Sequence, residues 1–240
     1  MKIFAMADGK VQALPSLYQA LRLDAATKTI AFVGGGGKTT LIYALAEELQ
    51  RRGKRVVVTT TTHMQRPKYF FVAEKLDAAC RAQLGKKAIL VAGQPCGNGK
   101  LSAVTAAFFA VLAESADYLL VEADGAKRLP LKVPDLHEPV LPEHADLVVG
   151  VAGIDALGKS IGEICHRAQR TADFLGKSLD DFVEEEDFAA IFQSNQGSRK
   201  QVHCRFQAVI HKVDTVSALA RAARIARLMK ETVIATGREL

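Results

Sequence analysis

The stretch that decides the fold is residues 29–40, Thr-Ile-Ala-Phe-Val-Gly-Gly-Gly-Gly-Lys-Thr-Thr. Its first five residues form a short apolar and β-branched run, which predicts a buried strand. After the glycines, apolar residues recur at helical spacing over 39–52. The glycines therefore lie between a strand and a helix, which is the context of a phosphate-binding loop.

The residue types of this loop suit the phosphates of a nucleotide. Glycines let successive backbone N–H groups point at one anion, because no Cβ stands in the way. We expect Lys38 to bridge β- and γ-phosphate oxygens and Thr39 to offer its hydroxyl to Mg²⁺. The usual spacing places a glycine five residues before the last one, where this chain has Phe32. The expected nucleotide-binding residues are Gly34, Gly35, Gly36, Gly37, Lys38, Thr39 and Thr40.

Short strand-like runs alternate with helical stretches along the whole chain, which is the pattern of a parallel α/β sheet. The predicted strands are 29–33, 55–60, 88–92, 118–122, 147–152, 206–211 and 232–235, and the predicted helices are 14–23, 39–52, 73–84, 101–115 and 216–230. We expect a P-loop NTPase-like three-layer sandwich with a mostly parallel sheet, forming one domain over 1–240. The polar stretch 161–201 predicts a small helical insertion, a candidate lid or docking surface.

Composition excludes several classes of protein. The chain has 240 residues, 49% hydrophobic and 24% charged, as in ordinary globular proteins. A net charge of +6 suits anionic ligands but is too small to indicate nucleic-acid binding. No apolar run reaches about 18 residues, and the N-terminus lacks an apolar signal-peptide core. We therefore expect a cytoplasmic protein without a membrane partner, and its four cysteines, none in a CxxC pair, indicate free thiols.

The second predicted strand ends in four threonines and a histidine. Ligands of a parallel sheet lie beyond the carboxyl ends of its strands. Thr61 and Thr62 fall there, so we expect them to contact substrate, and His63 is a candidate general base. Thr59 and Thr60 are equally natural as strand residues.

Two carboxylates lie at the end of the strand predicted over 118–122. Glu122 and Asp124 lie on the same face by the two-residue period of a strand. A carboxylate at this place is the Walker-B arrangement, which holds Mg²⁺ opposite the loop hydroxyl. We predict a Mg²⁺ site from Thr39, Glu122 and Asp124, and the catalytic candidates are Lys38, Glu122, Asp124 and His63. The alternative is that Asp124 and Gly125 only form a turn.

Two further segments carry candidate site residues. Lys212 and Asp214 match the end of the Asn-Lys-x-Asp pattern that binds guanine, but His211 replaces its asparagine, so ATP and GTP both remain open. Four of the seven prolines lie in 124–144, and a loop that long is usually functional. If this loop folds back over the sheet edge, it places four candidate substrate-binding residues at the site. They are Lys127, Lys132, His137 and Glu138. A rigid structural connector is the alternative.

Five blocks of this sequence together resemble the YqeC family, accessory proteins of selenium-dependent molybdenum hydroxylases. The blocks are 34–40, 58–63, 121–127, 129–134 and 137–142. The resemblance runs from about residue 15 to 236. It implies a cytoplasmic role in maturing a selenium-containing molybdenum cofactor, with the hydroxylase or cofactor-maturation proteins as partners.

Three functions fit these observations. The first is an NTP-hydrolysing maturation factor that uses Mg²⁺ with ATP or GTP. The second is a small-molecule kinase or nucleotidyl-transfer enzyme, whose acceptor would bind at the proline-rich segment. The third is a non-catalytic, nucleotide-gated binding module that recruits a partner through 161–201.

Overall fold

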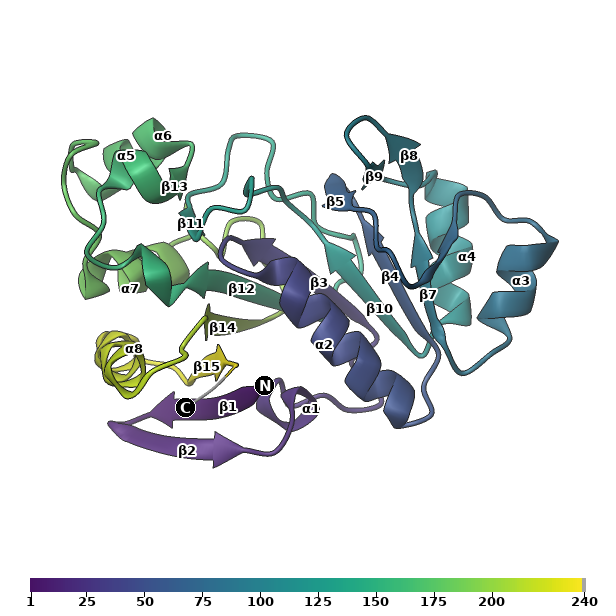
Figure 1. Cartoon of the computed structure of the whole chain (residues 1–240), viewed down its shortest axis with the longest axis horizontal. Helices are drawn as coiled ribbons and strands as arrows, with labels where there is room; N and C mark the ends of the chain where they lie inside the picture. The colour runs from purple at the N-terminus through teal and green to yellow at the C-terminus, as the bar shows by residue number, and fades with distance from the viewer. Residues whose placement is uncertain (239–240) are drawn as a thin grey trace.

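The computed structural model of this chain describes residues 1–238. Within them, ten strands form one sheet in the order β2-β1-β15-β14-β12-β3-β10-β4-β7-β6 (Figure 1). The eight strands from β15 to β6 run parallel, and β1 and β2 add an antiparallel edge. The strand bounds are β1 Lys2–Ala7, β2 Lys10–Leu14, β3 Thr29–Gly34, β4 Val56–Thr60, β6 Phe71–Ala73, β7 Ile89–Ala92, β10 Tyr118–Glu122, β12 Leu147–Gly153, β14 Arg205–His211 and β15 Val233–Gly237.

Two small sheets and a set of helices complete the described chain. The antiparallel sheet holds β5 His63–Gln65, β9 Lys100–Ser102 and β8 Gln94–Cys96, and the parallel pair is β11 Leu131–Lys132 with β13 Cys165–His166. The helices are α1 Leu17–Ala20, α2 Lys38–Arg51, α3 Ala78–Leu84, α4 Ala106–Ser115, α5 Ile161–Ile164, α6 Ala168–Leu175, α7 Glu185–Gln193 and α8 Val216–Leu228, with a 3-10 turn at Ile154–Ala156. Within residues 1–238, every helix is too short or too polar to span a bilayer.

Helices cover both faces of the large sheet, which makes the three layers expected from the sequence. Side chains of β3 alternate between the faces: Ile30 and Phe32 pack in the core that contains α2. Ala31 and Val33 belong to a separate cluster on the other face. Helices α4, α7 and α8 also pack on that second face. They contact the side chains of the sheet that point away from α2. The prediction of an α/β sandwich with a mostly parallel sheet is confirmed.

Strand order reverses beside β3. On one side of β3 the sheet continues with β10 and then β4, and on the other side it continues with β12, β14 and β15 (Figure 1). Parallel α/β sheets bind ligands outside the carboxyl ends of their strands at such a switch point. The fold therefore places the loop after β3 where a ligand is expected.

The N-terminus differs from the prediction. Residues 14–23 were expected to form a helix, because their leucines recur at helical spacing. Instead β1 and β2 form a hairpin on β15, and only the four residues of α1 are helical. Pro15 explains the late start, since a residue before proline avoids helical backbone, and Ser16 then caps α1 by accepting from the Gln19 N–H. The stretch 161–201, expected to be a helical insertion, contains α5, α6 and α7 together with the short strand β13.

Candidate functional site

The first half of the phosphate loop is braced by three other segments. Each of its first three glycines donates its N–H to a protein oxygen: Gly34 to Asp124 Oδ2 at 2.9 Å, Gly35 to Val151 O at 2.8 Å and Gly36 to Leu129 O at 3.0 Å. Gly36 has φ +70°, and a Cβ there would lie 2.1 Å from the Gly153 nitrogen. Only glycine fits this position, so the shape of the loop depends on the strand beside it.

The second half of the loop has free donors. Gly37, Lys38, Thr39 and Thr40 donate their backbone N–H groups to no acceptor within the described chain. These four groups start α2, where the helix dipole adds partial positive charge. Consecutive free N–H groups at a helix start bind phosphate.

Lys38 is buried and neutralised by Asp124. The lysine is 4% exposed, and its Nζ lies 3.0 Å from Asp124 Oδ1, an ion pair without hydrogen-bond geometry. Its ammonium donates instead to the carbonyl of Gly34. The neighbouring strands β3 and β10 bring the two side chains together, because they run parallel and end at the same sheet edge.

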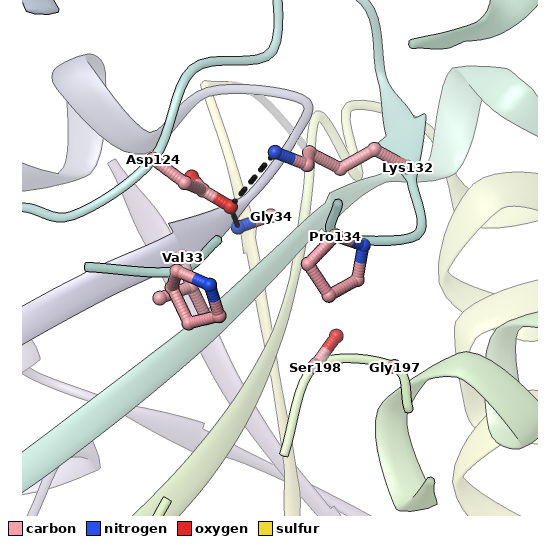
Figure 2. A pocket seen from close by; sticks show the side chains of 8 residues that line it. Val33, Gly34, Asp124, Lys132, Pro134, Gly197 and Ser198 are labelled. Carbon is pink, nitrogen blue, oxygen red and sulfur yellow. Dashed lines mark hydrogen bonds and ion pairs between the residues drawn. The ribbon is translucent and has the colours of Figure 1, made fainter. Parts of the chain in front are cut away.

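Asp124 also starts a chain of charges that leads to the insertion. Lys132 Nζ lies 3.2 Å from Asp124 Oδ2 and 2.5 Å from Glu138 Oε2. Figure 2 shows Asp124 between Lys132 and the Gly34 nitrogen. Arg167, which precedes α6 with φ +60°, donates two hydrogen bonds to Glu138. The two-residue ladder of β11 and β13 runs beside this chain, so backbone and charges both tie the insertion to the site.

The charge of Glu138 is stabilised by its partners. Burial by itself would raise the pKa of this carboxyl group. Hydrogen bonds and positive charge from Arg167 and Lys132 outweigh burial and lower the pKa to about 2. Glu138 is therefore ionised at neutral pH and holds Lys132 and Arg167 in place.

Glu122 occupies a different environment, although it lies only two residues from Asp124. Thr39 donates its hydroxyl to Glu122 Oε2 at 2.8 Å. No lysine, arginine or histidine of the described chain forms an ion pair with Glu122. Burial raises the pKa of this carboxyl group, and the charge of Lys38 only partly offsets that effect.

The donor set on this side fits Mg²⁺. Hydroxyl and carboxylate oxygens are the ligands that this cation prefers, and it is usually held by one or two carboxylates plus substrate phosphates. Thr39 and Glu122 would hold it, with Asp124 nearby on the same strand end. The described residues contain no cluster of three or more His, Cys, Asp or Glu side chains, so a cage made by the protein alone is not present.

A small cavity lies beside the first glycine of the loop. Its volume is about 10 Å³, close to the smallest space that holds one water molecule. A nucleotide does not fit there, so the free N–H groups of α2, not this cavity, define the candidate phosphate site. The lining residues are Val33, Gly34, Asp124, Lys132, Pro134, Pro139, Gly197 and Ser198 (Figure 2).

The threonines after β4 take separate positions. Thr61 donates its hydroxyl to the Val140 carbonyl at 2.6 Å, which ties this turn to the proline-rich segment. The Thr62 hydroxyl is buried and has no partner in the described chain. His63 is exposed and begins β5, where it pairs with Ser102. The structure thus buries the Thr62 hydroxyl and leaves His63 at the surface.

Two of the four predicted substrate contacts of the proline-rich segment point to solvent. Lys127 and His137 are exposed, whereas Lys132 and Glu138 take part in the buried charge chain. Lys127 and Arg128 both have positive φ and form no ion pair within the described chain. The turn that they form brings the Leu129 carbonyl onto Gly36.

The segment after β14 also reaches the loop. His211 is buried, and its Nδ1 lies 2.8 Å from the Thr236 hydroxyl. Burial lowers the pKa of this imidazole to about 4, and its ring lies against Gly37. Lys212 pairs with Asp155 at 2.7 Å, and the Asp214 carboxylate accepts the backbone N–H of Arg238 at 2.6 Å.

Sequence reasoning missed three contributors to this site. Arg167 follows no recognisable motif, and the carbonyls of Leu129 and Val151 are backbone groups that any residue would supply. In the sequence, only the run of four glycines at 34–37 indicated a close neighbour. Tyr43, four residues after Thr39, was assigned only to the helix.

Comparison with known proteins gives one family and one relative. A family model described as YqeC protein matches residues 30–169, more than half of the chain. The uncharacterized protein YqeC of Escherichia coli (strain K12) is 38% identical over 87 residues, which are 36% of this chain and 34% of that protein. The alignment thus spans about a third of the relative's length. No solved structure matches.

Proposed function

The chain belongs to the YqeC family, and we propose that it binds and hydrolyses a Mg²⁺-nucleotide in the maturation of a selenium-containing molybdenum hydroxylase. The hydrolytic part of the proposal rests on the phosphate loop and its two carboxylates. The maturation part rests on the family resemblance of the sequence blocks. The insertion at 161–201 would be the docking surface for the hydroxylase or a cofactor-maturation protein.

One observation carries the nucleotide proposal. The four free N–H groups of Gly37–Thr40 lie next to the buried ammonium of Lys38. An incoming phosphate would find donors that no protein acceptor already uses, at the positive end of a 14-residue helix. Gly37 and Thr39 are half-buried and Thr40 is exposed, so these donors are open to an incoming ligand.

The site residues then divide the work. Lys38 would exchange the Asp124 carboxylate for phosphate oxygens, which carry more negative charge. Asp124 keeps Lys132 and the Gly34 N–H when that exchange occurs. Thr39 and Glu122 would hold Mg²⁺, which neutralises charge on the phosphates when bound.

Phosphoryl or nucleotidyl transfer to a small molecule is the second candidate. Lys127 and Arg128 support it, because both are exposed, unpaired cations in a turn with positive φ that contacts the phosphate loop. Backbone strain of this kind concentrates at functional sites. An anionic acceptor could bind there.

The test is a binding and turnover panel with ATP, GTP and CTP, each with and without Mg²⁺. We expect Mg²⁺-dependent binding, release of phosphate, and a loss of affinity of about 100-fold or more in Lys38→Ala. Lys10→Ala, an exposed lysine on β2, is the matched control and should behave as wild type. A folded Lys38→Ala protein with wild-type affinity and turnover would refute the proposal. Turnover that requires an added acceptor would favour transfer over hydrolysis.

A further inference from the structure

Four buried side-chain polar atoms have no hydrogen-bond partner in the described chain. Three of them are Tyr43 Oη on α2, Thr62 Oγ1 after β4 and Asp124 Oδ1 after β10. The fourth, on Thr171, lies in the insertion. Buried polar groups in folded proteins are nearly always partnered, and an exception indicates a missing ion, water or ligand. Asp124 Oδ1 already lies 3.0 Å from the Lys38 ammonium, so the hydroxyls of Tyr43 and Thr62 are the two groups that indicate a missing water, ion or ligand.

Tyr43 stands on the same face of α2 as Thr39. The two residues are four apart, so their side chains are neighbours along the helix. Thr39 bonds to Glu122, so Tyr43 lies next to the side of the site where Mg²⁺ is expected. Burial raises the pKa of the Tyr43 phenol, and the negative charge of nearby Glu122 raises it further. The phenol therefore stays protonated and remains a donor at neutral pH.

The ring of Tyr43 has a packing partner, whereas its hydroxyl has no hydrogen-bond partner. Its ring stacks on Phe70 with centroids 5.1 Å apart and planes 3° from parallel. This contact fixes the ring and leaves the hydroxyl aimed at a fixed place without an acceptor. Packing alone would be satisfied by phenylalanine, so the hydroxyl needs a separate explanation.

Thr62 reaches the same edge from the neighbouring strand. Its backbone N–H donates to the Thr60 hydroxyl at 3.0 Å, and that hydroxyl donates to the Glu122 carbonyl at 2.8 Å. This relay holds Thr62 beside the end of β10. Glu122 is buried, with 7% of its surface exposed.

We infer that the hydroxyls of Tyr43 and Thr62 position water molecules around Glu122, as part of the hydration shell of the nucleotide-bound cation. The inference rests on the proposed nucleotide function and adds a residue to it. A bound Mg²⁺ keeps several of its waters, and such waters need protein donors and acceptors to be oriented. Tyr43 is a positioning residue, since it acts through these waters.

The experiment compares Tyr43→Phe with Tyr118→Phe. Tyr118 is buried at the start of β10, and its hydroxyl donates to the Asp24 carbonyl at 3.2 Å. Tyr43→Phe removes a hydroxyl without a partner, so we expect the Tm to stay level or rise by about 2–4 °C. The kcat of Tyr43→Phe should fall about 10-fold or more, and the variant should need more Mg²⁺ for its half-maximal rate. Its nucleotide Kd should stay within about twofold of the wild-type value. Tyr118→Phe should lower the Tm and leave turnover unchanged.

Thr62→Val is the second variant, because valine keeps the shape of threonine without its hydroxyl. We expect the same raised Mg²⁺ requirement. The inference is wrong if both variants turn over as wild type does while Lys38→Ala is inactive, since the nucleotide function would then stand alone. It is also wrong if Tyr43→Phe loses stability as Tyr118→Phe does. A wild-type protein that binds no nucleotide would overturn the proposed function itself.

Discussion

Glu122 and Asp124 end the same strand, two residues apart, and both are buried, yet their surroundings are opposite. Asp124 contacts two lysine ammonium groups, Lys38 at 3.0 Å and Lys132 at 3.2 Å, and accepts the Gly34 N–H. Glu122 has the Thr39 hydroxyl and no cation. The strand supplies the two carboxylates, and remote segments decide which of them is neutralised.

The difference has an energetic meaning. Removing a carboxylate from water costs several kcal/mol unless partners compensate. The desolvation cost of the Asp124 carboxylate is compensated by groups of the protein itself, namely the two lysines and the Gly34 N–H. Glu122 is compensated only in part, so the pKa of its carboxyl group is raised by burial. An incoming cation would complete the Glu122 side, whereas the Asp124 side already has its partners and would change only if the proposed phosphate displaced it from Lys38.

The largest expected effect comes from Asp124→Asn. This change leaves Lys38 and Lys132 buried without their shared negative charge. Breaking a buried ion pair by removing one partner costs about 3–5 kcal/mol. We expect a loss of that size in the free energy of unfolding, measured by urea denaturation at pH 7. A loss below about 1 kcal/mol would show that Asp124 is not the centre of a stabilising network.

Glu138→Gln tests how far that network extends and should have a middle-sized effect. The charged hydrogen bonds to Lys132 and Arg167 are lost, at a cost of about 2 kcal/mol at neutral pH. Hydrogen exchange of the α6 amides should speed up, because Arg167 precedes that helix. Unchanged exchange in α6 would contradict the link to the insertion.

The pH dependence of Glu138→Gln has a definite sign. In the wild-type protein the folded-state pKa of the Glu138 carboxyl group is about 2, below the ordinary value of 4.5. The Glu138 carboxylate therefore stabilises the fold above pH 4.5. That contribution is lost as pH falls through about 2. The stability difference between wild type and variant should therefore shrink on acidification, and a difference that grew would refute the assignment.

The smallest effect on stability is expected from Glu122→Gln. No internal cation is orphaned, so the free energy of unfolding should change by less than about 1 kcal/mol or rise. The folded-state pKa lies above 4.5, so the folded protein binds more protons than the unfolded chain just above that pH. Wild type should therefore lose stability relative to the variant as pH rises above 4.5. A variant as destabilised as Asp124→Asn would remove the contrast between the two carboxylates.

Much of this architecture could be predicted from local patterns. The apolar run before the glycines, the helical spacing after them and the carboxylates at the end of 118–122 all depend on neighbours within a few residues. Those patterns correctly placed β3, α2 and β10 and brought Lys38, Glu122 and Asp124 to one sheet edge. The nucleotide roles of these residues stay predictions.

Other features depend on partners far along the chain. Residues 10–14 form the strand β2, which pairs with β1. Strand β1 in turn pairs with β15 from the opposite end of the sequence. The extra strands of the small antiparallel sheet took the first residues of a stretch expected to be helical, 101–115, into β9. Local spacing cannot reveal such pairings, since their free energy is gained only when both strands are present.

The sequence by itself determined the glycine-rich loop at 34–37, the helix after it and the position of two carboxylates, because the backbone geometry of glycine and the periods of strand and helix are local properties. Only the tertiary structure decided that Lys132 neutralises Asp124, that no cation of the described chain forms an ion pair with Glu122, and that Tyr43 holds a buried hydroxyl without a partner. The reason is physical: desolvation and charge pairing depend on every group within a few ångströms. Those groups come from segments up to about a hundred residues apart, as the separation of 94 residues from Lys38 to Lys132 illustrates.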